Sequence, residues 1–124
     1  MLVCVTGQRT CEKLIRAGAQ LAAERGGELS VLHVARTGQR FLGSEDEAAA
    51  LEYLFQVSRE NGADMNLTHS DDVPGAIVAF ARKCGAAAVL IGMPRGRRSD
   101  LGLAYILRAQ LPEAEVREMI TSGD

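Results

Sequence analysis

The chain has 124 residues, of which 47% are hydrophobic, and its formal net charge at pH 7 is -2. This length predicts one domain covering residues 1–124, and this composition excludes an intrinsically disordered chain. The small net charge gives no electrostatic reason to bind nucleic acid, and no apolar run is long enough to predict insertion into a membrane.

The first third of the chain has the pattern of a strand, a helix and a second strand. The apolar run Leu2–Thr6 predicts a buried strand, and Gly7–Thr10 predicts a turn after it. Apolar residues then recur at helical spacing as far as Gly26 and Gly27, a pair that is typical of a helix end. A second apolar run, Leu29–Val34, predicts the second strand.

The middle of the chain begins with a predicted loop at Thr37–Gly43. Ser44 and, three residues later, Glu47 form a capping-box pattern that predicts a helix start. This helix is expected to end at Asn61–Gly62, and Ala63–Thr68 is predicted to be a strand at the edge of the sheet because polar and apolar residues alternate in it. The residues expected on the apolar side of the helix are Ala48, Leu51, Leu54, Phe55 and Ser58.

The last third repeats the same alternation. Its most apolar run, Ala87–Ile91, is expected at the centre of the sheet. The predicted elements are a helix capped by Asp72 and closed by Cys84–Gly85, a strand at Ala87–Ile91, a basic loop at Gly92–Arg98, a helix capped by Ser99 and broken at Leu111–Pro112, and a strand at Val116–Ile120.

Strands that alternate with helices predict an α/β fold, a three-layer α/β/α sandwich around a five-stranded parallel sheet. The first and fourth strands are the most apolar and must form the inner pair, which gives the strand order 3-2-1-4-5. In such a sheet a ligand binds where the order reverses, beyond the carboxyl ends of the first and fourth strands.

Four stretches carry a resemblance to the universal stress protein family. They are Val3–Gly7, Glu28–Val34, and Asp71–Ile77 followed by Val89–Gly92. The resemblance implies the adenine nucleotide alpha hydrolase-like fold and a regulatory role in stress response or signalling, without enzymatic activity. Within the family, the chain most resembles the universal-stress-like domain of potassium-sensor histidine kinases. The alternative function is therefore a sensory docking module of a histidine kinase or transporter. A nucleotide hydrolase is a third alternative.

The family's ATP-binding members differ from this chain at the residues that hold the phosphates. Thr6 stands where they carry an Asp, and Gly92 matches the first glycine of their G-x-x-G loop. The position of the family's second glycine is occupied by Arg95, or by Gly96 if the loop is one residue longer. The position of the family's Gly-Ser pair is occupied by Tyr105–Ile106. Glycine and serine there let backbone N–H groups approach phosphate oxygens. The resemblance therefore implies that ATP and AMP bind weakly or not at all, with no cofactor.

The basic loop after the fourth predicted strand can instead be interpreted as an anion site. Arg95, Arg97 and Arg98 precede a predicted helix start, and both guanidinium groups and helix N–H groups bind phosphate-type anions. A solvated basic turn is the other interpretation. The residues expected to line the nucleotide or anion site are Thr6, Gly7, Val34, Gly92, Arg95, Gly96, Arg97, Arg98 and Ser99.

Histidine and cysteine residues give weaker signals. His33 and His69 each end a predicted strand, but two histidines without a third ligand do not predict a metal site. The three cysteines, Cys4, Cys11 and Cys84, have no C-x-x-C spacing and predict free thiols in the cytoplasm. A redox role for Cys11, near a helix start, is the alternative.

The last predicted strand, Val116–Ile120, would lie at an edge of the sheet. An edge strand offers unpaired backbone groups, and Pro112 lies before this strand, too early to block them. Members of the family that the chain resembles commonly pair through this strand. We therefore expect a homodimer through the fifth strand.

Overall fold

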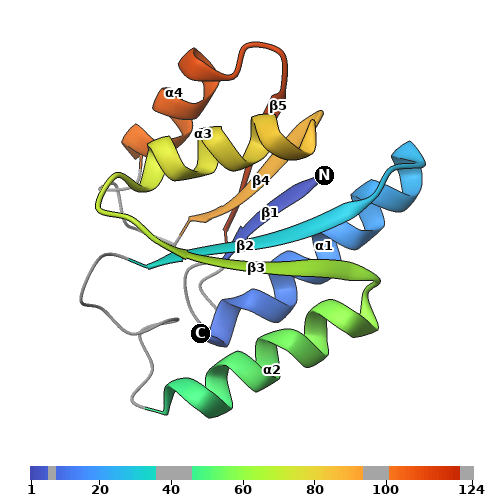
Figure 1. The fold of residues 1–124 in the computed structure, drawn as a ribbon. Coiled ribbons are helices and arrows are strands. Elements are labelled where there is room, and N and C mark those ends of the chain that lie inside the picture. The colour runs from blue at the N-terminus through green and yellow to red at the C-terminus, as the bar shows by residue number, and fades with distance from the viewer. Residues whose placement is uncertain (6–7, 36–45, 94–100, 121–124) are drawn as a thin grey trace.

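The computed structural model describes residues 1–5, 8–35, 46–93 and 101–120. Five parallel strands form one sheet in the order β3-β2-β1-β4-β5 (Figure 1). The strands are β1 (Leu2–Val5), β2 (Leu29–Ala35), β3 (Ala63–His69), β4 (Ala88–Met93) and β5 (Glu115–Ile120). The helices are α1 (Gln8–Arg25), α2 (Glu47–Glu60), α3 (Val73–Cys84) and α4 (Leu101–Gln110). The predicted fold class and strand order are confirmed.

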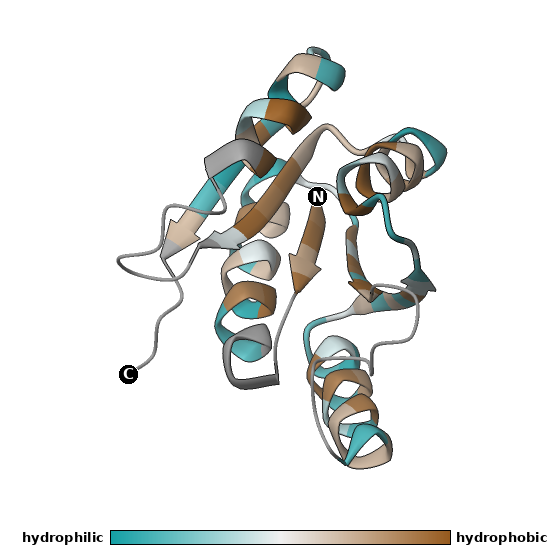
Figure 2. Ribbon diagram, turned by 90° about the vertical axis from the view of Figure 1, so that its left-hand side faces the viewer, coloured by the Kyte–Doolittle hydropathy of each residue, from teal (hydrophilic) through white to brown (hydrophobic). Residues whose placement is uncertain are grey.

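Two apolar clusters fill the spaces between the sheet and its helices. Helices α1 and α2 cover one face of the sheet, and α3 and α4 cover the other (Figure 1). The sides of β1 alternate between the clusters, with Val3 and Val5 facing α1 and Leu2 and Cys4 facing α3. Figure 2 shows the hydrophobic colour concentrated on β1 and β4 at the centre of the sheet. The apolar character of these two strands therefore fixes the strand order, as predicted.

Helix α1 packs closely on β1 at a glycine. A Cβ atom on Gly18 would overlap Cγ2 of Val3, and it would lie 3.3 Å from Cδ1 of Leu29. The absence of a side chain at Gly18 therefore sets how near α1 lies to the central strand. On its other side α1 is tied to α2, because the Tyr53 hydroxyl donates a 2.6 Å hydrogen bond to Oε1 of Glu12.

Helix α3 begins and ends at the predicted residues. The Asp72 carboxylate accepts a 3.0 Å hydrogen bond from the Gly75 N–H, and Pro74 lies in the first turn. Gly85 closes the helix in the left-handed conformation, with φ of 66°. Both devices satisfy backbone groups that a helix end leaves without partners.

Three predicted boundaries are wrong. Helix α1 begins at Gln8, so Gln8–Thr10 is its first turn and not a separate turn. Helix α2 is capped by Asp46, which accepts a 3.1 Å hydrogen bond from the Ala49 N–H, and Glu47 is already helical. Ser44 therefore does not cap it; that residue lies outside the described part of the chain. Strand β4 extends through Gly92 to Met93, because Met93 still pairs with Ile120 of β5.

The buried side of α2 also differs from the prediction. Its buried residues are Ala50, Leu54, Val57 and Ser58. Ala48 is exposed and Phe55 is 49% exposed, so neither belongs to the core. Leu54 and Ser58 are buried as predicted, and Leu51 packs against the core cluster, whereas Ala50 and Val57 take the places expected for Ala48 and Phe55.

Candidate functional site

The carboxyl ends of β1 and β4 meet at the point where the strand order reverses. The connection after β1 leads to β2 on one side, whereas β4 pairs with β1 on the other side. In the register of the sheet Val5 lies level with His33, and Cys4 lies level with Ile91. When the loops after two adjacent parallel strands run to opposite sides of the sheet, a crevice forms between the loops. Open α/β sheets bind ligands in this crevice.

A small apolar pocket lies at this end of the sheet, on the side of α3 and α4. Its floor is formed by β1, β2 and β4, and its walls are the first turns of α3 and α4. Its volume is about 30 Å³, which is room for about two water molecules. The described residues that line it are Cys4, Val5, Leu32, Val34, Val73, Ile77, Ile91, Gly92 and Leu103.

His33 holds the end of β1 from the opposite face of the sheet. Its side chain is 3% exposed, and its Nδ1–H donates a 2.7 Å hydrogen bond to the Val5 carbonyl. Because a carbonyl oxygen only accepts, this bond requires a proton on Nδ1. His33 therefore fixes the last described residue of β1 beside the crevice.

The surroundings of His33 favour its neutral form. Burial lowers the pKa of His33, and the nearby His69 lowers it further, whereas the hydrogen bond to Val5 acts in the opposite direction. The free energy lost when an imidazolium is removed from water exceeds the free energy gained from its hydrogen bond to one carbonyl. The imidazole is thus neutral near pH 7.

The Cys4 thiol lies in the floor of the pocket, and its burial disfavours the reactive thiolate. Burial raises the pKa of Cys4 to about 12, and the nearby Cys84 contributes to the same shift. A thiol reacts as its thiolate, so Cys4 is a core residue, as predicted. Cys4 and Cys84 are both free thiols, and the side chain of Cys11 lies outside the described part.

Two of the nine predicted site residues, Val34 and Gly92, line the pocket. The other seven lie outside the described residues: Thr6, Gly7, Arg95, Gly96, Arg97, Arg98 and Ser99. Sequence reasoning missed the apolar walls at Val73, Ile77 and Leu103. The helical pattern gives no sign that these residues border the switch point, because that follows only from the pairing of the strands.

The described residues contain neither a grouping typical of a metal site nor a helix suited to span a membrane. Within residues 1–5, 8–35, 46–93 and 101–120, no three or more His, Cys, Asp or Glu side chains are grouped as they would be around a metal ion. In the same ranges no helix combines the length and hydropathy that are needed to cross a membrane.

Comparisons with known proteins converge on one family. Residues 1–104 match the sequence model of the Universal stress protein family. Over 98 residues, or 79% of the chain, it is 34% identical to the sensor protein KdpD of Mycobacterium tuberculosis. Over 101 residues, or 82% of the chain, it is 33% identical to a putative sensor protein KdpD of Synechocystis. The chain spans 11% of the first relative's length and 27% of the second's.

Solved structures share the fold. The universal stress protein of Archaeoglobus fulgidus superimposes with a TM-score of 0.64 at 25% identity, covering 94% of this chain and 90% of the other. A universal stress protein in complex with cAMP superimposes with a TM-score of 0.63 at 16% identity, covering 98% of each chain. A structure from Archaeoglobus fulgidus in complex with dAMP gives a TM-score of 0.58 at 23% identity, covering 94% of each chain.

Proposed function

The chain belongs to the universal stress protein family, and from this premise we propose that it is a cytoplasmic regulatory domain with a degenerate nucleotide site between β1 and β4. One observation carries the proposal: the pocket at the switch point is apolar but has a volume of only about 30 Å³. An adenine base has about ten non-hydrogen atoms, so it requires a larger space than about two waters occupy. Regulation through weak binding fits this site better than catalysis.

The residues around the pocket support the same proposal. Val73 and Leu103 close it from the two helices, and at Thr6 the carboxylate of the ATP-binding members is absent. Two structures similar to this chain are complexes with cAMP and with dAMP, which defines the class of compound to test. The free Cys4 and Cys84 thiols support a reducing compartment such as the cytoplasm.

We expect adenine nucleotides to bind with dissociation constants of about 1 mM or weaker, about 4 kcal/mol of binding free energy. Isothermal titration with ATP, ADP, AMP and cyclic AMP, with and without Mg²⁺, measures this. Leu103→Ala provides the matched variant: it enlarges the pocket and should strengthen AMP binding severalfold. A micromolar constant for wild type, about 8 kcal/mol, would contradict the degenerate site.

We further propose that the basic loop binds a phosphate-type anion. Phosphate or sulfate should then raise the melting temperature by a few degrees, about 1 kcal/mol of stabilisation in a domain of this size. The double substitution of Arg97 and Arg98 by Ala should abolish the rise. Arg16, a solvent-exposed arginine on α1, provides the control for lost surface charge. No rise in wild type would favour a solvated turn.

A sensory docking module of a longer protein is the second candidate. It is favoured by the similarity to KdpD sensor proteins, of which the chain spans only 11% to 27%. In that role the domain binds another part of the sensor, and the nucleotide site carries no signal. The reading frame that encodes the chain distinguishes the two candidates, because a docking module is continuous with a kinase or transporter.

We also propose that the chain forms a homodimer through β5. A groove of about 370 Å³ lies between α1 and β5, and Leu21 and the half-buried Met119 offer apolar contact there. One structural feature opposes pairing. The Glu115 N–H donates to the carbonyl of Ala87, the residue just before β4, so the backbone of Val116 faces outward. There the Val116 carbonyl accepts a 3.0 Å hydrogen bond from Arg108.

Arg108→Ala should therefore strengthen the dimer. Pairing of two β5 strands requires the Val116 carbonyl, and breaking its bond to a guanidinium costs about 1.5 kcal/mol, or about tenfold in the dimer constant. Arg82→Ala is the matched control, because Arg82 donates to the Gln110 carbonyl, away from the β5 edge. Sedimentation velocity measures both. Monomers at all concentrations for wild type and Arg108→Ala would rule out pairing through β5.

A further inference from the structure

The opposite edge of the sheet, β3, also turns backbone groups outward. The Ser70 N–H donates a 2.8 Å hydrogen bond to the Ala35 carbonyl of β2. Because backbone groups alternate in direction along a strand, those of Met65 and Leu67 point away from the sheet. Within the described ranges these outward groups have no hydrogen-bond partner.

Among residues 1–5, 8–35, 46–93 and 101–120, no side chain covers the β3 edge as Arg108 covers β5. Strand β3 has seven residues without proline, and apart from His69 its only ionisable side chain is Asp64, which is exposed. Natural sheets usually block an exposed edge of this length with proline, bulges or several charges. β5 has such charges, since Glu115 pairs with Arg117 and Glu118 with Arg108. β3 is the less protected of the two edges.

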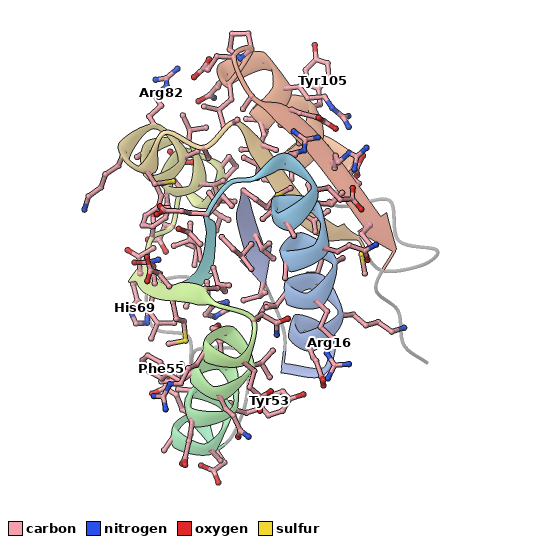
Figure 3. All side chains as sticks on the ribbon, turned by 90° about the vertical axis from the view of Figure 1, so that its right-hand side faces the viewer. Arg16, Tyr53, Phe55, His69, Arg82 and Tyr105 are labelled. Carbon is pink, nitrogen blue, oxygen red and sulfur yellow. The ribbon has the colours of Figure 1, made fainter. Side chains whose placement is uncertain are left out.

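An exposed aromatic side chain lies beside this edge. Phe55 on α2 is 49% exposed, and with Met65 it lines a pocket of about 340 Å³ between the end of α2 and the start of β3. Figure 3 shows Phe55 on the side of α2 away from Tyr53, the residue that bonds to α1. A second hollow of about 470 Å³ along α2 shares Phe55 and Arg59 with it. Phe55 is thus the one apolar side chain that the two hollows share, and it lies beside the start of β3.

The wall of the same pocket holds a buried hydroxyl group that lacks a partner. Ser58 is 1% exposed, and its Oγ has no hydrogen-bond partner among the residues that the structure describes. Buried hydroxyl groups in folded proteins are nearly always paired.

The surroundings of the edge are acidic. Residues 46–69 carry five acidic side chains and one basic side chain, Arg59, which is a net charge of -4 in a chain whose total is -2. Glu52, Glu60 and Asp64 are exposed around the pocket and the hollow. These charges repel another acidic surface and attract lysine and arginine.

From these observations we propose that the edge of β3, together with Phe55 on α2, binds an extended basic segment of another polypeptide as a sixth strand. The outward backbone groups of Met65 and Leu67 supply the hydrogen bonds. Phe55 and Met65 contact an apolar side chain of the segment, and the acidic residues select its lysine or arginine neighbours. Strand addition of this kind takes affinity from the backbone and specificity from alternate side chains.

A second copy of this chain fits the edge less well. Two copies joined at β3 would place two surfaces of net charge -4 against each other. A chain that pairs with itself at both β3 and β5 would also extend its sheet without limit, since neither interface closes the assembly. A different, basic polypeptide avoids both problems.

A synthetic peptide of alternating valine and lysine tests the proposal on the whole chain. We expect it to bind in low salt at least about tenfold more tightly than a valine–glutamate counterpart, with affinity falling as salt screens the charges. A third peptide carries N-methyl groups along one edge, which removes its backbone donors but keeps its charge. Its binding should be about tenfold weaker, because strand pairing requires those donors. Equal binding of the methylated peptide would overturn strand addition.

Two protein variants locate the binding site. Phe55→Ser should weaken binding of the valine–lysine peptide by about tenfold, because an aromatic anchor is lost. Tyr105→Ser is the matched control on α4, at the other end of the molecule (Figure 3), and should bind as wild type does. Circular dichroism checks that both variants are folded. Wild-type affinity in Phe55→Ser, no peptide binding to wild type, or a homodimer that Phe55→Ser disrupts would each overturn the proposal.

Discussion

Gly18→Ala will lower the free energy of unfolding by about 1–2 kcal/mol, although Ala is the better helix former by about 1 kcal/mol. The new Cβ would overlap Cγ2 of Val3, a residue with no exposed surface on the central strand. The branched Val3 side chain cannot turn away from the helix, because it is enclosed by the core between α1 and β1. Chemical denaturation at pH 7 measures the loss.

A double-mutant cycle shows whether the loss arises from this contact. Val3→Ala removes Cγ2, and the Cβ that remains would lie 3.7 Å from the new atom, an ordinary contact. The double variant should therefore be more stable than the sum of the single variants predicts, by at least about 1 kcal/mol. Gly27→Ala is the control, since a Cβ there meets nothing within 4 Å. Additive losses would show that Gly18 is required for another reason.

The fold could be predicted because strong local signals agree with the tertiary structure. The aliphatic runs in β1 and β4 require burial on both faces, which leaves them no position except the centre of a parallel sheet. The errors occur where two local signals overlap. Around α2 the capping-box pattern of Ser44 and Glu47 led to Ser44 as the cap, whereas the Asp46 carboxylate, which accepts from the Ala49 N–H, determines the start.

The site was harder to predict because its contacts are distant in sequence. His33 was predicted at the end of a strand, but its bond to Val5 joins residues 28 positions apart and follows from the register of two strands. The end of β4 likewise depends on its partner, since Gly92 pairs with Met119 of β5. A strand's length is fixed by its neighbour as well as by its own residues, so Gly92 alone suggested a loop.

The two edges of the sheet suggest a division of roles. At β5 the guanidinium of Arg108 holds the Val116 carbonyl, so pairing there requires a side chain to move first. At β3 the outward groups of Met65 and Leu67 are ready to bind, beside an acidic surface. We therefore expect the association at β5 to be weak and the association at β3 to depend on salt, as electrostatic recognition does.

His33→Asn should reduce the dependence of stability on pH below pH 7. Burial lowers the pKa of His33 in the folded chain, whereas an unfolded histidine titrates near its ordinary pKa of about 6.5. As the pH falls through that value the unfolded chain binds the proton first, so the folded state loses stability. The slope for one group is at most about 1.4 kcal/mol per pH unit, and above about pH 7.5 it vanishes.

The substitutions separate the charge of His33 from its hydrogen bond. The amide of His33→Asn can still donate to the Val5 carbonyl but does not titrate, so stability near pH 7 should change little while the acid slope flattens. His33→Leu removes the donor and leaves the buried carbonyl unpaired, which should cost about 1–3 kcal/mol relative to His33→Asn at every pH, since neither side chain titrates. His69→Asn is the control and should keep most of the slope, because His69 only adds to the effect of burial. Denaturant titrations between pH 5.5 and 8 test this, and an unchanged slope in His33→Asn would place the titrating group elsewhere.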